Sequence, residues 1–87
     1  MNSYIISYDL NDHKDYPKLI SRIKDYPNAE GINKSVWFVN SVFSAKEIRD
    51  ELKLFVDNDD SLFVAKLTGE AAWSNVICDS KHLKDYL

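Results

Sequence analysis

Residues 4–12 read Tyr-Ile-Ile-Ser-Tyr-Asp-Leu-Asn-Asp, an apolar run that ends abruptly in the carboxylate of Asp9. Successive side chains of a strand point to opposite faces, and here both faces are mostly apolar. That pattern is typical of a central strand covered on both sides. The stretch therefore predicts a central strand over residues 4–9, with an aspartate where the strand ends.

Two helices are predicted after this strand. Asp15 can cap the first helix, which carries Pro17 in its first turn and ends at Pro27. The sequence Ser-Ala-Lys-Glu at 44–47 is a capping box, the strongest local helix signal in the chain. Apolar residues follow it at helical spacing, so the second helix should run to about Val56.

Two further strand signals complete the pattern. Residues 29–43 are rich in β-branched and aromatic side chains, with a bend or hairpin near Gly31 and Asn33-Lys34. Residues 61–67 form the last strand. Crossovers between strands of one sheet are right-handed, which places both helices on the same face. The predicted fold class is α+β, a ferredoxin-like βαββαβ domain with helices on one face of an antiparallel sheet.

The 87 residues are enough for one small domain, 1–87, with a core over about 3–67 and a tail over 68–87. Residues 80–87 suit a short helix in that tail. The other face of the sheet is expected to be open and apolar, which predicts a homodimer or a bound partner.

The composition limits where the protein works and what it binds. Eleven basic and fourteen acidic residues give a formal charge of −3, which disfavours nucleic-acid binding because affinity for phosphates usually needs a basic surface. A single cysteine, Cys78, fits a reducing compartment. No run approaches the roughly 20 apolar residues of a membrane span, and no signal peptide is recognised. We expect a cytoplasmic protein.

Six short motifs occur in order along residues 3–74. They are Tyr-Ile-Ile-Ser-Tyr-Asp-Leu-Asn at 4–11, Asp-Tyr at 15–16, Ser-Val-Trp at 35–37, Ile-Arg-Asp at 48–50, Asp-x-x-Asp-Ser-Leu-Phe-Val at 57–64 and Ala-Ala-Trp at 71–73. As a set they resemble the small bacterial SinR-type proteins. That group is similar to the CRISPR-associated Cas2 endoribonucleases and to the virulence-associated D toxins.

The resemblance implies a ferredoxin-like fold and a dimer formed through sheet edges and open faces. In the nuclease members, an aspartate at the end of the first strand of each protomer holds a divalent metal across the dimer axis. Asp9 matches that aspartate, so it is predicted to be catalytic and to bind Mg²⁺, a cation that prefers oxygen ligands. Ser35 matches the serine of the middle-strand motif and is predicted to act beside it. The arginine-rich stretch expected near this strand is replaced by Asn33-Lys34.

The residues alone leave alternatives open. Asp9 can instead close the strand by accepting from the amides of Asn11 or Asp12 in an Asx turn. His13 could serve as a general acid or base, although polar residues crowd every such loop. The aspartates of residues 57–60 are interpreted as a turn.

Two functions remain open from the sequence. One is a Mg²⁺-dependent endoribonuclease or endonuclease that cleaves phosphodiesters. The other is a non-catalytic dimeric interaction module that binds a protein partner, as in a toxin–antitoxin or defence system.

Overall fold

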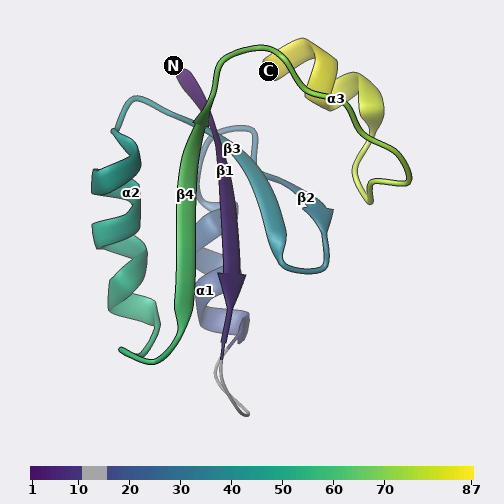
Figure 1. Ribbon diagram of the computed structural model, residues 1–87. Coiled ribbons are helices and arrows are strands. Elements are labelled where there is room, and N and C mark those ends of the chain that lie inside the picture. Colours follow the sequence, from purple (N-terminus) through teal and green to yellow (C-terminus); the bar gives the residue numbers. More distant parts are fainter. Residues whose placement is uncertain (11–15) are drawn as a thin grey trace.

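One four-stranded sheet and its helices make up the computed structural model, which describes residues 1–10 and 16–87 (Figure 1). The elements are β1 (Asn2–Asp9), α1 (Tyr16–Lys24), β2 (Glu30–Asn33), β3 (Val36–Ser41), α2 (Ala45–Leu52), the 3-10 turn η1 (Lys53–Phe55), β4 (Ser61–Leu67) and α3 (Ser80–Tyr86). The sheet has the order β2-β3-β1-β4, and each neighbouring pair is antiparallel. This arrangement confirms the predicted α+β, ferredoxin-like fold.

The apolar run at the start of the chain forms the central strand, as predicted. β1 pairs with β3 on one side and with β4 on the other. Its alternate residues Tyr4, Ile6 and Tyr8 are buried in the main hydrophobic core. By the two-residue period of a strand, Ile5, Ser7 and Asp9 point to the opposite face.

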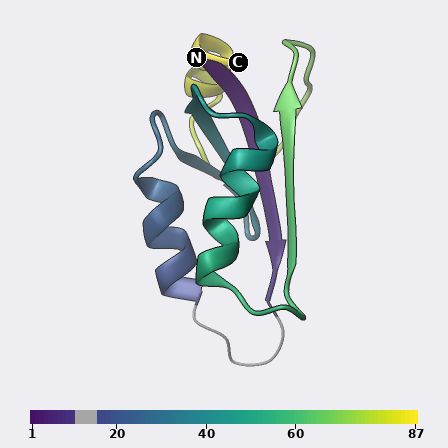
Figure 2. The same ribbon diagram turned by 90° about the vertical axis from the view of Figure 1, so that its left-hand side faces the viewer.

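Helices α1 and α2 lie side by side on the core face of the sheet (Figure 2). Their apolar stripes are fully buried, at Leu19 and Ile23 in α1 and at Ile48 and Leu52 in α2. Burying such stripes against the sheet is the main source of helix stability in a domain of this size.

The local start and end signals of the helices are mostly confirmed. The Glu47 N–H donates to Ser44 Oγ at 3.1 Å, and the Ser44 N–H donates to Glu47 Oε1 at 2.9 Å, which completes the capping box. α2 is shorter than predicted, because the segment up to Phe55 tightens into η1. The predicted cap at Asp15 lies outside the described residues.

A polar cluster joins the two helices at their outer side. The guanidinium of Arg22 donates to Glu51 Oε2 at 2.6 Å, and the Tyr26 hydroxyl donates to Glu51 Oε1. Burial acts to raise the pKa of the Glu51 carboxyl, but the hydrogen bonds from Tyr26 and Arg22 outweigh it and lower that pKa. The charged carboxylate of Glu51 therefore links α2 to Arg22 of α1.

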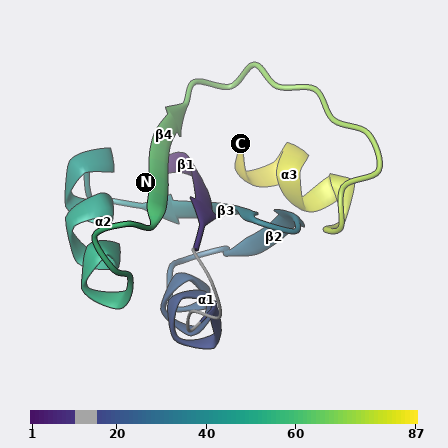
Figure 3. The ribbon, with the colours of Figure 1, turned by 60° about the horizontal axis from the view of Figure 1, so that its bottom comes forward.

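The expectation of a fully open second sheet face is wrong for one half of that face. α3 lies across β2 and β3, on the side of the sheet opposite α1 (Figure 3). Phe38 of β3 is 0 % exposed and Leu83 of α3 is 2 % exposed. The ring of His82 meets Phe38 edge-on at a centroid distance of 6.0 Å. The tail thus supplies a second, smaller apolar cluster rather than leaving β3 bare.

Hydrogen bonds hold α3 in this position. The Ser3 hydroxyl donates to the carbonyl of Tyr86 at 2.7 Å, and Asn40 Nδ2 donates to Ser3 Oγ at 2.9 Å. Nε2 of His82 lies 2.9 Å from the carbonyl oxygen of Asn28. Because Ser3 and Asn40 are buried, these bonds satisfy polar groups that would otherwise be costly to bury.

The remaining boundaries agree closely with the sequence pattern. The segment 29–43 divides into β2 and β3, which are joined at Lys34-Ser35 with a register shift between Gly31 and Asn33. None of the described helices has the length and apolar character needed to cross a membrane.

Candidate functional site at the end of the central strand

Asp9 is the last residue of β1, and its side chain is exposed. It lies on the face opposite Tyr8, and therefore on the side of the sheet that α1 and α2 do not cover. In the neighbouring strand its register partner is Ser61, the first residue of β4. Paired residues of adjacent strands point to the same face, so a carboxylate and a hydroxyl lie next to each other here.

Ser35 reaches the same end of the sheet from the turn between β2 and β3. Its carbonyl oxygen accepts from the Tyr8 N–H at 3.1 Å, which holds Ser35 beside the residue that precedes Asp9. The residue also lines a hollow of about 360 Å³ with Tyr8 and Tyr16, on the side where the helices pack. The two predicted catalytic residues thus share one end of the sheet, while Asp9 does not line that hollow. Their catalytic roles remain predictions.

Further carboxylates gather near Asp9. Asp57, Asp59 and Asp60 lie directly before β4, and their carboxylate oxygens are within 4.8 Å of one another. The Asp57 N–H donates to Asp60 Oδ2 at 2.7 Å, and the Asp60 N–H donates to the Asp57 carbonyl at 3.1 Å. These bonds are those of a turn and agree with the interpretation from sequence. The cluster also makes this end of the sheet acidic.

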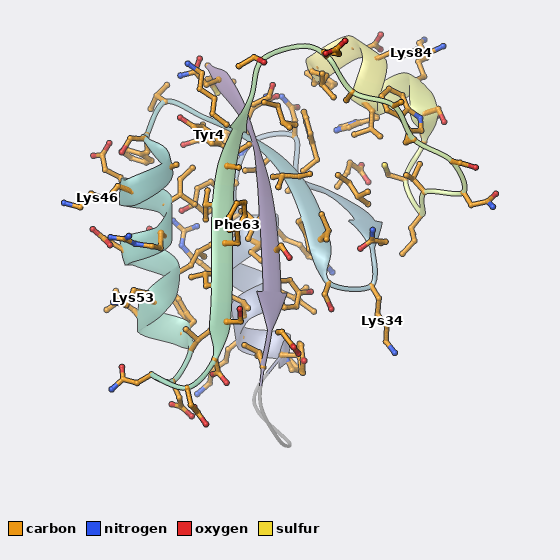
Figure 4. All side chains as sticks on the ribbon, in the orientation of Figure 1. Tyr4, Lys34, Lys46, Lys53, Phe63 and Lys84 are labelled. Atoms are coloured by element: carbon orange, nitrogen blue, oxygen red, sulfur yellow. The ribbon has the colours of Figure 1, made fainter. Side chains whose placement is uncertain are left out.

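The half of this sheet face that runs along β1 and β4 carries exposed apolar side chains. Phe63 of β4 stands on this face with 63 % of its surface exposed, and Ile5 of β1 is only half-buried (Figure 4). α3 covers β3 (Figure 3) and reaches β1 near its start, through the bond from Ser3 to Tyr86. The uncovered half is therefore a strip along β1 and β4 that leads to Asp9.

Most aromatic side chains that could stack on bases are not available to do so. Tyr4 and Tyr8 are buried against the helices, and Phe38 is buried under α3. Trp37 is half-buried over Gly31, with the ammonium of Lys24 6.0 Å from its ring centroid. This burial is that of residues that pack within the domain.

Sequence reasoning did not single out several residues at this end of the sheet. Ser61 becomes a neighbour of Asp9 only through the pairing of β1 with β4, which no local motif reports. Lys34 and Tyr16 meet Tyr8 through the fold as well. His13, and the Asn11 and Asp12 amides of the alternative Asx turn, lie outside the described residues.

Comparison with known proteins identifies the family. The family model described as CRISPR associated protein Cas2 matches residues 1–75. That span holds all four strands, α1, α2 and the Asp9 end of the sheet, but not α3. No curated protein and no solved structure matches the chain significantly. A match over most of the chain is sufficient for membership, and the chain therefore belongs to the CRISPR associated protein Cas2 family.

Proposed function

We propose that this protein is a homodimeric, metal-dependent endoribonuclease or endonuclease in which Asp9 of each protomer contributes to one shared Mg²⁺ site. The observation that carries the proposal is the position of Asp9. Its carboxylate is exposed at the end of the central strand, on the half of the sheet face that α3 leaves uncovered. We also propose that the protein resembles the SinR-type group within the family and that it is cytoplasmic.

The uncovered strip supports the homodimer. Phe63 is a large apolar side chain with 63 % exposure on the same face as Asp9. Burial of apolar surface is worth about 25 cal/mol per Å², so this strip favours contact with a second apolar surface. In a two-fold interface only residues near the axis meet their own copies. The shared site therefore requires an axis that passes close to the Asp9 end of the strip.

The donor atoms at this position suit the proposed cation. Mg²⁺ is commonly bound by one or two carboxylates together with water and substrate phosphate oxygens. Asp9 supplies a carboxylate, and Ser61 supplies a hydroxyl opposite it in the sheet register. When bound, a divalent cation would stabilise the negative charge that develops on a phosphodiester during cleavage.

The chain's own residues would position the substrate. The carbonyl oxygen of Ser35 accepts from the Tyr8 N–H, which places the residue at the same end of the sheet as Asp9. Its hydroxyl is suited to donate to a phosphate oxygen of the bound strand. The acidic residues before β4 make this end unattractive to a phosphate backbone unless a cation is present.

A second candidate function is a non-catalytic dimeric module that binds a protein partner. The observation that favours it is charge, because the chain carries −3 overall and three aspartates lie directly before β4, at the end of the sheet where Asp9 lies. A protein with a basic surface would be attracted to that end of the sheet. In this case the apolar strip would still serve the dimer.

A cleavage assay separates the two functions. Labelled single- and double-stranded RNA and DNA are incubated with purified protein in Mg²⁺ or in chelator. The nuclease function predicts cleavage in Mg²⁺ that is lost in chelator and in Asp9→Asn, and reduced in Ser35→Ala. Asp50→Asn, an exposed carboxylate change on α2, is the matched control and should cleave as wild type does. Cleavage that persists in Asp9→Asn removes Asp9 from the mechanism, and no cleavage of any substrate favours the binding module.

A further inference from the structure

His82 of α3 has one ring nitrogen bonded within the protein and one that faces a carboxylate. Nε2 lies 2.9 Å from the carbonyl oxygen of Asn28. A carbonyl oxygen can only accept, so Nε2 carries the proton of this bond. In the neutral ring Nδ1 then keeps a lone pair, and it lies 3.9 Å from Oε1 of Glu30. Two acceptors face each other there, an arrangement that a cation between them would stabilise.

The imidazole of His82 is held in place by its neighbours. Its side chain is 20 % exposed, and its ring packs against Phe38 at a centroid distance of 6.0 Å and against Tyr86 at 4.8 Å. Histidines that bind metal ions usually donate their other ring N–H to a carbonyl or carboxylate, which fixes the tautomer and the orientation of the ring. The bond from Nε2 to the Asn28 carbonyl gives this support, so Nδ1 is already oriented as a ligand.

The segment before α3 runs beside β2 (Figure 1). The Ile77 N–H donates to the carbonyl oxygen of Ile32 at 2.8 Å, which fastens this segment to the edge of the strand. Glu30 is the first residue of β2 and pairs in register with Phe38. Paired residues point to the same face of a sheet, so the Glu30 side chain lies on the face that α3 covers.

Cys78 adds a thiol to this region. It directly follows Ile77, and its side chain is partly buried. Burial raises the pKa of the thiol, and the nearby carboxylates of Glu30 and Asp79 raise it further. The Asp79 carboxylate already accepts from the Lys81 N–H at 3.0 Å as the cap of α3. The negative surroundings disfavour a bare thiolate, and they favour a cation that would bind beside it.

We infer that Glu30, Cys78 and His82 bind a divalent metal ion of the zinc class, with a carboxylate oxygen, Sγ and Nδ1 as the ligands. Nitrogen and sulfur ligands select such ions over Mg²⁺. Bonds from zinc to nitrogen or oxygen are about 2.0–2.2 Å long, so two such ligands of one ion lie no more than about 4.3 Å apart. The 3.9 Å between Nδ1 and Oε1 is within this limit. A fourth position would be left for water.

The thiol has to move for all three ligands to reach one ion. Among the described residues, only three aspartates before β4 form a group of three potential ligands whose atoms all lie within 4.8 Å of one another. Sγ of Cys78 therefore has to turn toward Nδ1 and Oε1, and the thiol loses its proton to solvent as it binds. Because two ligands belong to the tail and one to β2, the ion would fasten α3 to the sheet.

This site is separate from the one proposed at Asp9. Glu30 pairs with Phe38, and Phe38 pairs with Ile5, which precedes Asp9 by four residues along β1. β3 lies between β2 and β1. The inference therefore requires neither the shared Mg²⁺ site nor the nuclease activity.

The test is a titration of the reduced protein with Co²⁺, a spectroscopic substitute for Zn²⁺, in excess Mg²⁺ that fills sites made of oxygen ligands. We expect one Co²⁺ for each chain, with a thiolate-to-cobalt charge-transfer band that disappears when Zn²⁺ is added. Cys78→Ser should abolish the band. Absence of saturable binding, or saturable binding without this band, would overturn the inference.

Three further variants make the result specific. Glu30→Gln and His82→Gln each remove one ligand and should weaken binding at least about tenfold, because even partners of metal ligands are worth that much. The amide of His82→Gln can still donate to the Asn28 carbonyl. Glu70→Gln, in the exposed segment after β4, is the matched charge control and should bind as wild type does. Equal binding in Glu30→Gln and Glu70→Gln, or unchanged binding in His82→Gln, contradicts the assigned ligands.

Thermal unfolding separates metal binding from folding. Zn²⁺ should raise the midpoint of unfolding of the wild-type protein and leave that of Cys78→Ser nearly unchanged. An equal rise in Cys78→Ser would place the ion elsewhere and overturn the inference. Glu30 is 44 % exposed, so Glu30→Gln should keep the fold and the metal-free midpoint, and it tests the site even where His82→Gln loosens α3. None of these measurements depends on cleavage, so the proposed nuclease function can fail separately.

Discussion

The C-terminal helix should contribute substantially to the stability of the domain, and Leu83→Ala tests this. Leu83 is 2 % exposed and is the buried residue of α3. The change removes buried methyl and methylene groups worth about 0.8 kcal/mol each, and a residual cavity adds to the cost. Measured costs for buried Leu→Ala changes span about 2–5 kcal/mol. Because α3 is a short helix at the edge of the domain, it can move to fill part of the space that Leu83 leaves. We therefore expect the free energy of unfolding to fall by about 2–3 kcal/mol.

That loss is a large fraction of the total free energy of unfolding. At about 0.05–0.15 kcal/mol per residue, a chain of this length has a free energy of unfolding of roughly 4–13 kcal/mol. Urea unfolding followed by tryptophan fluorescence measures the change, since Trp37 lies in β3 and Trp73 lies in the segment before α3. Leu54→Ala is the matched control, because Leu54 is 80 % exposed and its loss should change stability by less than about 0.5 kcal/mol.

The refuting result is a Leu83→Ala protein as stable as the Leu54→Ala control. It would mean that α3 does not rest on the sheet in solution. The face around Phe38 would then be open along its whole width, as the sequence alone had suggested.

Three further predictions concern the helices and the dimer. Ser44→Ala removes the side-chain oxygen that caps α2 and should lower the free energy of unfolding, measured in urea, by about 1 kcal/mol. Ser74→Ala, in the exposed segment after β4, is the control and should lower it little. Equal losses in the two variants would contradict the cap assignment. Glu51 has a pKa below its ordinary value of 4.5, so its contribution is present above that value and is lost as the pH falls through the lowered pKa. Glu51→Gln should therefore be less stable than wild type at neutral pH, with the difference shrinking as the pH falls below 4.5 and through the lowered pKa. A difference that does not change with pH would show that the charge is not responsible. Phe63→Ser should weaken dimerisation about tenfold or more in sedimentation equilibrium, while Leu54→Ser on the far side should not; an unchanged dimer would remove the β4 strip from the interface.

Local sequence patterns predicted most of the fold. The apolar run at residues 4–9 predicted β1, the capping box predicted the start of α2, and β4 spans the predicted residues 61–67. Each of these signals depends only on residues that are neighbours in the sequence, so it can be recognised without knowledge of the tertiary contacts. The order of elements then leaves few topologies, because crossovers are right-handed.

The position of the tail could not be predicted in the same way. Leu83 and its neighbours suit a short helix, but nothing in that segment states which face of the sheet it returns to. The answer depends on long-range contacts, such as the bond from Ser3 to Tyr86 and the contact of His82 with Phe38. Those partners are far apart in the sequence.

The candidate site was predictable in part for a similar reason. Asp9 is marked by its place at the end of an apolar run, and Ser35 by a short motif. Ser61 becomes a neighbour of Asp9 only through the register of β1 and β4. Such features depend on which atoms meet, and the sequence pattern reports only which residues are buried.

The most direct test of the central claim is a calorimetric titration of the protein with Mg²⁺ beside Asp9→Asn, with the oligomeric state measured on the same samples. The proposed shared site predicts a dimer that binds one ion for every two chains, and no binding at this site in Asp9→Asn. Equal binding in Asp9→Asn, or one ion in each isolated chain, would contradict it.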